Sequence, residues 1–213
     1  MPGVYRPQAD TTLLMQAMLT ATIPLDKRVL DMGTGTGALA IRAAMAGARS
    51  VTAVDISWPA IVSAWLNSRA RGVRLELLHG ELSRVPHRRL FDLVLVNPPY
   101  VPSPKKVPSR GPARAWEGGT EGRAVLDVLC RMMPRMLDSH GVGLMVHSAL
   151  CKPEATLSQL REGGLKAAVV AREMVAFGPK MRKRADWLES AGLIEPGQRH
   201  EELVVIRADR TQA

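Results

Sequence analysis

The four residues from Asn97 to Tyr100, with the sequence NPPY, could together orient a nitrogen atom for reaction. Pro98 and Pro99 have a fixed backbone dihedral φ and donate no hydrogen bond, so they hold their carbonyl groups as rigid acceptors. The Asn97 side-chain oxygen is a further acceptor, and Tyr100 supplies a flat aromatic face. This set suits a planar NH2 group on an sp2 carbon, as in a carboxamide or an adenine amine. On its own, the same tetrapeptide could be an ordinary turn.

A planar NH2 nitrogen is a poor nucleophile because its lone pair is delocalised. Two acceptors that each bind one N–H would orient it and favour the positive charge that it gains during attack. The chemistry expected at Asn97 and Pro98 is therefore positioning and electrostatic stabilisation, without a histidine or carboxylate base.

A glycine-rich turn lies about 60 residues before this motif and could bind a cofactor. Glycines alternate with threonines in the order Gly33, Thr34, Gly35, Thr36 and Gly37. Glycine allows a sharp turn and lets a ligand approach the backbone without meeting a Cβ atom. Such a turn between a strand and a helix could be only a tight turn, or could bind a nucleotide.

Two acidic residues flank the glycine-rich turn. Asp31 ends the apolar segment before the glycines, and Asp55 ends the next apolar segment, 18 residues beyond Gly37. A carboxylate at this second place can accept hydrogen bonds from both hydroxyls of a ribose. Asp55 could equally cap the helix that starts near Ser57.

Strand-like and helix-like segments alternate along the chain and would position these residues. Strands are predicted at 28–33, 50–56, 74–80, 91–97, 141–150, 165–174 and 201–210. Helices are predicted near Thr11 and at 37–48, 58–72, 124–137 and 153–164. Near-continuous apolar strands separated by helices are typical of a parallel sheet with helices on both faces. The two late strands, separated by the basic stretch 180–193 without a full crossover helix pattern, predict an antiparallel edge.

Composition favours one globular α/β domain over residues 1–213. The chain has 46% hydrophobic and 23% charged residues, and no apolar run approaches the roughly 20 residues that a membrane helix needs. We divide it into an N-terminal segment with a helix (1–25) and an α/β core (26–213). The N-terminus lacks the pattern of a secretory signal, so we expect the protein in the cytoplasm.

Charge and cysteine content add two expectations. The net charge of +9 favours an anionic partner such as RNA or a ribosome, although scattered arginines can also reflect genome composition. Cys130 and Cys151 form no CxxC pair and lie near no histidine cluster, so we expect core positions and no metal site.

Asp31, the three glycines and Asp55 together resemble the binding set of class I S-adenosylmethionine methyltransferases. The resemblance implies a Rossmann-like, mostly parallel seven-stranded sheet, with Asp31 bearing on the methionyl amino end and Asp55 and Ile56 beside the ribose. It also implies Glu81 and Leu82 near the adenine. A solvated turn is the competing interpretation of Glu81.

Further segments resemble the HemK family of release-factor glutamine methyltransferases, in its short form. These are VYRPQADTTLL (4–14), AWEGGTEGRAVLDVL (115–129) and EELVVIRADR (201–210). In the first segment Pro7 would hold the chain across the cofactor site, where the resemblance implies a role for Asp10 and Thr11 in cofactor binding. Asp10 could also simply cap the helix, and Gln8 departs from the family by standing where an acidic residue is usual.

The HemK resemblance implies methyl transfer to the amide of a glutamine in the GGQ loop of a release factor. A small activator subunit is possible. NPPY also occurs in enzymes that methylate adenine or guanine, and some similar short proteins act on lysine. The sequence also allows a nicotinamide-dependent oxidoreductase, which GxGxG disfavours, or a non-catalytic cofactor-binding module. Basic residues after NPPY could contact a partner or be solvated: Lys105, Lys106, Arg110 and Arg114. The stretch 180–184 is predicted to be an exposed helix face.

Overall fold

The structure is a computed structural model, and it describes residues 4–21, 24–81, 90–105, 107–108 and 111–211. Its strands are β1 (Arg28–Met32), β2 (Ser50–Asp55), β3 (Glu76–His79), β4 (Phe91–Val96), β5 (Leu137–Ser148), β6 (Lys166–Ala176) and β7 (His200–Asp209). Its α-helices are α1 (Ala9–Thr20), α2 (Ala38–Met45), α3 (Trp58–Ala70), α4 (Leu126–Met136), α5 (Pro153–Glu162), α6 (Pro179–Arg182) and α7 (Ala185–Ser190).

The strands form one seven-stranded sheet in the order β3-β2-β1-β4-β5-β7-β6. Strands β1 to β5 are parallel to one another, and β7 is antiparallel to both of its neighbours, β5 and β6. The mostly parallel sheet with an antiparallel end, predicted from the sequence, is confirmed. The antiparallel strand is the second from the edge, and β6 is the edge strand.

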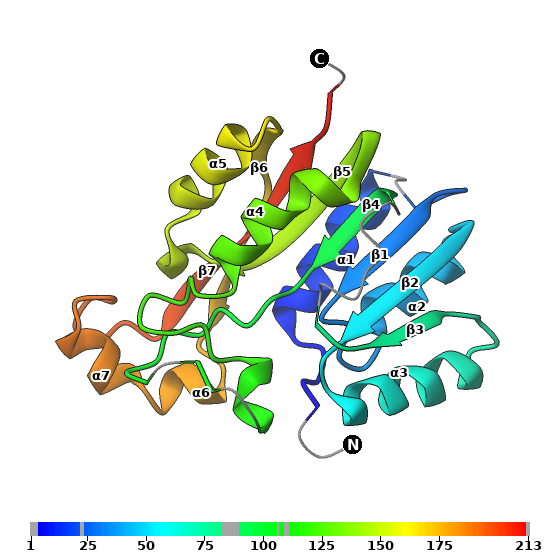
Figure 1. The fold of residues 1–213 in the computed structure, drawn as a ribbon. Coiled ribbons are helices and arrows are strands. Elements are labelled where there is room, and N and C mark those ends of the chain that lie inside the picture. Colours follow the sequence, from blue (N-terminus) through cyan, green and yellow to red (C-terminus); the bar gives the residue numbers. More distant parts are fainter. Residues whose placement is uncertain (1–3, 22–23, 82–89, 106, 109–110, 212–213) are drawn as a thin grey trace.

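Helices cover both faces of the sheet. Helices α1, α2 and α3 lie on one face, and α4 and α5 lie on the other (Figure 1). The central strands are apolar throughout because both of their faces are covered: every residue of β4 from Leu93 to Val96 has no exposed surface. In the same way Val29 and Leu30 of β1 are fully buried.

The order of the strands sets the place of a ligand site. From β1 the chain moves to β2 and β3 on one side, and then returns to the other side of β1 with β4. In open α/β sheets a ligand binds outside the carboxyl ends of the strands at this reversal. The ends of β1 and β4, at Met32 and Val96, are therefore the expected floor of the site.

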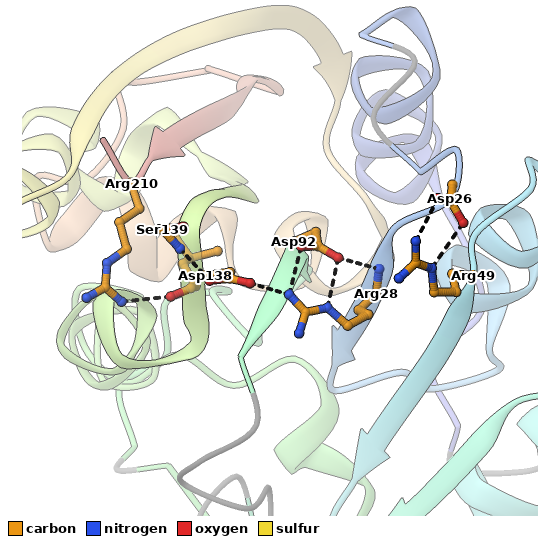
Figure 2. Close-up of polar contacts among 8 residues, drawn as sticks. Asp26, Arg28, Arg49, Asp92, Asp138, Ser139 and Arg210 are labelled. Carbon is orange, nitrogen blue, oxygen red and sulfur yellow. Dashed lines mark hydrogen bonds and ion pairs between the residues drawn. The ribbon is translucent and has the colours of Figure 1, made fainter. Parts of the chain in front are cut away.

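Ion pairs join the strands at the opposite, amino edge of the sheet (Figure 2). At the start of β1, the Arg28 guanidinium donates to the Asp92 carboxylate of β4 over 2.9 and 3.0 Å and also pairs with Asp138 of β5. Asp26 and Arg49 form a further pair at 2.8 Å. These contacts fix the register of β1, β4 and β5 at the edge away from the glycine-rich turn. Within the described residues, no helix combines the length and the hydropathy needed to cross a bilayer.

Candidate active site

A cavity of about 940 Å³ lies at the carboxyl ends of β1, β2 and β4. The arrowheads of these strands in Figure 1 point toward the N-terminal segment, which supplies part of the wall. The lining comes from the glycine-rich turn, the ends of β2 and β3, the NPPY motif, the loop that follows it and one side of α4. Segments far apart in the sequence thus meet in one space.

The three glycines of the turn all have backbone conformations that favour glycine, but they have different tasks. Gly33, Gly35 and Gly37 have φ angles of +73°, +56° and +81°. A Cβ atom on Gly33 would meet no atom within 4 Å, so this glycine leaves open space at the cavity wall. A Cβ on Gly37 would come within 3.0 Å of the Ala64 Cβ, so Gly37 permits the packing of α2 against α3 and does not line the cavity.

Asp31 is buried beneath the turn, and one of its two side-chain oxygens has no hydrogen-bond partner among the described residues. Its Oδ2 atom accepts hydrogen bonds from the Thr34 hydroxyl at 2.6 Å and from the Ala40 amide at 3.1 Å. Its Oδ1 atom is buried and has no hydrogen-bond partner among the described residues. Burial raises the pKa of this carboxyl to about 6. A buried, unpartnered carboxylate oxygen costs free energy unless a ligand satisfies it, and a cationic group is the matching ligand.

Asp55 joins the ends of two elements and lines the cavity. Its Oδ2 atom accepts the Gly35 amide and its Oδ1 atom accepts the Ser57 amide, both at 2.9 Å. The sequence left a choice between a helix cap and a ligand contact. The structure shows Ser57 as the N-cap residue of α3, with Asp55 supporting the turn before it. Each carboxylate oxygen keeps a further lone pair for a hydroxyl of a ligand.

The end of β3 closes the same side of the cavity. Ile56 and Glu81 both line it, and the Gly80 amide donates to the Asp55 carbonyl at 2.9 Å, which brings the end of β3 to the end of β2. Leu82, predicted beside Glu81, lies outside the described residues.

Asn97 lies at the end of β4 with its amide directed by Thr11 of α1. The Asn97 Nδ2 atom donates to the Thr11 hydroxyl oxygen at 3.1 Å. No hydrogen bond reaches the Oδ1 atom of Asn97, or the carbonyl oxygen of Pro98, from the described part of the chain. Asn97, Pro98, Pro99 and Thr11 all line the cavity.

Tyr100 and Asp10 are turned away from the cavity, which corrects two sequence predictions. The Tyr100 side chain is buried, its hydroxyl donates to the Asp10 Oδ2 atom at 3.0 Å, and neither residue lines the cavity. Tyr100 therefore does not form an aromatic wall of this cavity, and Asp10 does not line it either. Asp10 is not a helix cap either, because α1 begins at Ala9 with Gln8 as its N-cap residue.

Asp10 instead binds two phenols that sequence reasoning did not bring together. Its Oδ2 atom also accepts the Tyr5 hydroxyl at 2.7 Å. Burial, followed by the charge of Asp10, raises the pKa of both Tyr5 and Tyr100, so both phenols remain donors. The segment VYRPQADTT places Tyr5 five residues before Asp10, and this spacing could have indicated the contact. Glu201, a further buried acid in this region, was missed because it looks like the polar start of a strand.

The loop after NPPY folds back on the motif, and Gly118 and Gly122 hold it there. Val101 pairs with Glu117 in a parallel bridge, and the Gly118 amide donates to the Val101 carbonyl at 2.9 Å. A Cβ atom on Gly122 would stand 2.3 Å from the Tyr100 carbonyl oxygen. The loop can pack against NPPY only because a glycine stands there.

The basic stretch 180–184 is only partly an exposed helix face. Lys180, Arg182 and Lys183 are exposed, but Met181 is buried and Arg184 is half-buried. The Lys180 ammonium lies 3.9 Å from the centre of the Trp116 ring. Of the basic residues after NPPY, Lys105 is exposed and Arg114 lines the cavity, while Lys106 and Arg110 lie outside the described residues.

The residues at this cavity fit S-adenosylmethionine. Gly33 leaves room for a close approach, and Asp55 offers acceptors for its ribose. Asp31 is buried beneath the turn and does not itself line the cavity, but its unpartnered oxygen matches the ammonium group. The apolar side chains of Val54 and Ile56 line the same cavity and suit a flat base. When bound, S-adenosylmethionine supplies a methyl group attached to a cationic sulfur.

The fold and the site define a Rossmann-like methyltransferase that depends on S-adenosylmethionine. The chain belongs to the methyltransferase small domain family, which matches residues 2–109, and within it to the HemK group. It is 33% identical to the mouse methyltransferase HEMK2, with 76% of this chain and 80% of that protein covered.

A further relative supports this assignment, and solved structures share the fold. A Methanocaldococcus jannaschii protein, provisionally named as a protein N5-glutamine methyltransferase, is 32% identical, with 83% of this chain and 88% of that protein covered. One similar structure is the Mtq2–Trm112 complex of E. cuniculi, which is described as responsible for methylation of the translation termination factor eRF1. It matches with a TM-score of 0.66 and 20% identity, covering 98% of this chain and 99% of that one. The T. thermophilus 16S rRNA N2 G1207 methyltransferase RsmC, solved with AdoMet and guanosine, has a TM-score of 0.64 and 21% identity, covering 99% and 46%.

Proposed function

We propose that this enzyme methylates the side-chain amide nitrogen of a protein glutamine, namely the glutamine of the GGQ loop in a peptide-chain release factor. The observation that carries the proposal is the orientation of Asn97. Its NH2 group is bound to Thr11, which leaves its oxygen to accept an N–H beside the carbonyl of Pro98. A primary amide has two N–H groups, and these two acceptors match them.

The residues of the motif would act by orientation and by electrostatics. The Asn97 oxygen and the Pro98 carbonyl each accept one N–H, so the amide plane is fixed with the nitrogen facing the cofactor space. As the new N–C bond forms and the S–C bond breaks, positive charge develops on the nitrogen, and both acceptor dipoles stabilise it. The surplus proton then leaves to water. Asp31, Asp55, Ile56 and Glu81 are proposed to hold the cofactor, with Thr34, Gly33 and Gly35 forming its turn.

The relatives support glutamine over the other amino groups. Protein glutamine is the substrate class in the name of the M. jannaschii relative, and release factors appear in the name of a Neisseria gonorrhoeae relative that is 34% identical over 68% of this chain. A base amine presents the same planar NH2 group and remains the second candidate, because RsmC shares the fold. Two further expectations belong to the proposal. A release-factor substrate would place the enzyme in the cytoplasm, and it would bring the enzyme close to RNA or the ribosome, which the net charge of +9 favours.

A small activator subunit is also part of the proposal. Helix α3 exposes four large apolar side chains at the helical spacing of one face: Trp58, Val62, Trp65 and Leu66. It packs beside β3, which is the edge strand at that end of the sheet. An apolar face beside an edge strand suits a protein partner. The structural relative from E. cuniculi was solved as a complex with Trm112.

The test measures transfer of labelled methyl from S-adenosylmethionine to three substrates, with and without a Trm112-type subunit. They are a release factor, its GGQ→GGA variant and ribosomal RNA. We expect label in the release factor, none in the GGQ→GGA variant, and none with Asn97→Ala enzyme that still binds cofactor. Thr12→Val, which changes an exposed threonine of α1, is the matched control and should keep full activity. Label found only in RNA would replace glutamine by a base as the substrate.

A further inference from the structure

Asp10 is a buried acid that is hydrogen-bonded to two residues of the cavity wall, Tyr5 and Thr11, and to the buried Tyr100. Its side chain is 4% exposed and has no ion-pair partner among the described residues. Its Oδ1 atom accepts the Thr11 amide at 2.5 Å and the Thr11 hydroxyl at 3.1 Å, and its Oδ2 atom accepts the hydroxyls of Tyr5 and Tyr100. A buried carboxylate without a cation is costly, and these donors from three segments hold it in one place.

The hydrogen bonds from Asp10 to Asn97 have a fixed direction. A carboxylate only accepts hydrogen bonds, so the single proton of the Thr11 hydroxyl is committed to Asp10. The Thr11 oxygen can then act only as an acceptor toward Asn97, 3.1 Å away. Asn97 must therefore turn its NH2 group toward Thr11 and its oxygen toward the cavity.

The direction matters because the two ends of an amide have nearly the same shape. A rotation of the Asn97 amide by half a turn would fit the same space, and only its hydrogen-bond partners select one orientation. In the rotated state an NH2 group would face the substrate nitrogen, whose N–H groups need acceptors. Such a state would bind the substrate amide poorly and would repel the positive charge that develops on its nitrogen.

We propose that Asp10 and Thr11 are positioning residues that select the oxygen-outward orientation of Asn97 through the Thr11 hydroxyl. The proposal rests on the proposed function for its effect on catalysis, but the orientation itself can be measured without substrate. It also assigns a task to Asp10, which does not line the cavity.

Three variants of neighbouring threonines separate this role from packing and from cofactor contact. Thr11→Val keeps the shape and removes the hydroxyl, and Thr11→Ser keeps the hydroxyl. Thr12→Val makes the same change at an exposed site, where the hydroxyl donates to the Gln8 carbonyl. We expect Thr11→Val to lower kcat on the release factor by on the order of tenfold or more. The dissociation constant of S-adenosylmethionine should change less than about threefold, and Thr11→Ser and Thr12→Val should keep kcat near that of the wild type.

If Thr11→Val raises the dissociation constant of S-adenosylmethionine but leaves kcat at saturating cofactor unchanged, the proposal is overturned. Thr11 would then act only on cofactor binding. Equal losses in Thr11→Ser and Thr11→Val would also overturn it, since the hydroxyl would be irrelevant.

A second measurement uses the asparagine content of the chain. The sequence holds two asparagines, Asn67 and Asn97, so selective ¹⁵N-asparagine labelling gives two side-chain amide signals. The Asn67 amide donates to the Thr36 carbonyl at 2.9 Å and reports whether the variant is folded. We expect the bonded Asn97 proton to shift upfield and to exchange faster with water in Thr11→Val alone, with Asn67 unchanged.

Unchanged Asn97 signals in a folded Thr11→Val protein would overturn the orienting role whatever the substrate is. If the signals respond as expected but the wild type leaves the release factor unlabelled, the orienting role stands and the proposed substrate is wrong.

Discussion

The Arg184 guanidinium pairs with the buried Glu117 carboxylate, 67 residues earlier in the chain, and so ties the start of α7 to the loop after NPPY. The same guanidinium donates to the Pro102 carbonyl at 2.9 Å. Although burial raises the pKa of Glu117, hydrogen bonds from Arg184 and Ser103 outweigh it and leave the pKa lowered. The loop beside the active site is therefore held by an ion pair from the C-terminal part of the chain.

Arg184→Met should destabilise the protein because Glu117 would keep a buried charge without its partner. We expect a loss of about 2–3 kcal/mol in the free energy of unfolding, measured by urea denaturation. The KM for the release factor should rise more than the dissociation constant of S-adenosylmethionine. Arg182→Met, at an exposed position two residues earlier, is the control and should change neither. Adding Glu117→Gln to Arg184→Met should restore part of the stability; a double variant that is less stable still would contradict this account.

Gly122→Ala should be among the most damaging small substitutions in the loop. Its Cβ atom would stand 2.3 Å from the Tyr100 carbonyl oxygen and 2.5 Å from the Cys151 sulfur, at a φ of +73°. We expect a loss of about 3 kcal/mol or more, from overpacking and backbone strain together.

Gly192→Ala is the matched control for Gly122→Ala. It has a similar φ of +66°, and a Cβ there would meet no atom within 4 Å. Its cost should be about 1 kcal/mol, from backbone strain alone. Equal effects of the two variants in urea denaturation would show that the clash with NPPY relaxes at little cost.

The sequence predicted the sheet well because its strongest signals are local. Continuous apolar runs identify buried strands, and alternating glycines between a strand and a helix identify the turn. Strand β5 was predicted from residue 141 but begins at Leu137, because Leu137 pairs with Phe91 across a register shift that no local pattern reveals. The division at residue 25 into an N-terminal segment and a core stays a prediction.

The site was predicted less completely because its geometry depends on tertiary contacts. Asp10 looks like a helix cap when only its neighbours in sequence are considered, but its actual donors include Tyr100, 90 residues away. Tyr100 looks like a stacking surface, yet its hydroxyl points toward that buried acid. The tie between Arg184 and Glu117 could not be foreseen from a basic stretch that resembles a solvated helix face.

The affinity for S-adenosylmethionine should fall as the pH falls below about 6. Burial raises the pKa of Asp31 to about 6, so in the free protein its carboxyl becomes neutral below that pH and loses its attraction for the cofactor ammonium. The dissociation constant should rise by up to about tenfold for each pH unit below 6. Calorimetry between pH 5 and pH 8 measures this. The Asp31→Asn variant should bind S-adenosylmethionine weakly across this range, and its dissociation constant should not depend on pH there. A wild-type dissociation constant that stays constant between pH 5 and pH 8 would contradict the role of Asp31.

The stability of the cofactor-free protein should respond to Asp31 with the opposite sign. The pKa of this carboxyl is higher in the folded state than the ordinary aspartate value of 3.8, so the folded state binds the proton more tightly between these values. Its contribution to stability is full below pH 3.8 and is lost as the pH rises through about 6, a change on the order of 3 kcal/mol. The difference in unfolding free energy between wild type and Asp31→Asn, followed from pH 4 to pH 8, isolates this contribution. A difference that does not move with pH would show that the acid is not destabilised by its burial.

The exposed face of α3 should bind the proposed activator subunit. Trp65 is 52% exposed there, and replacing it by serine removes the largest contact surface at the middle of the face without opening the core. We expect Trp65→Ser to weaken binding of a Trm112-type subunit by at least about tenfold, as is usual for a central aromatic residue of an interface. Met174→Ser is the control, because Met174 is 66% exposed on β6, at the opposite end of the sheet from β3. Binding is measured by calorimetry, and the cofactor affinity of each variant alone shows that it is folded. If both variants bind the subunit as the wild type does, α3 is not the docking face; if Met174→Ser alone loses binding, the subunit docks at the β6 edge instead.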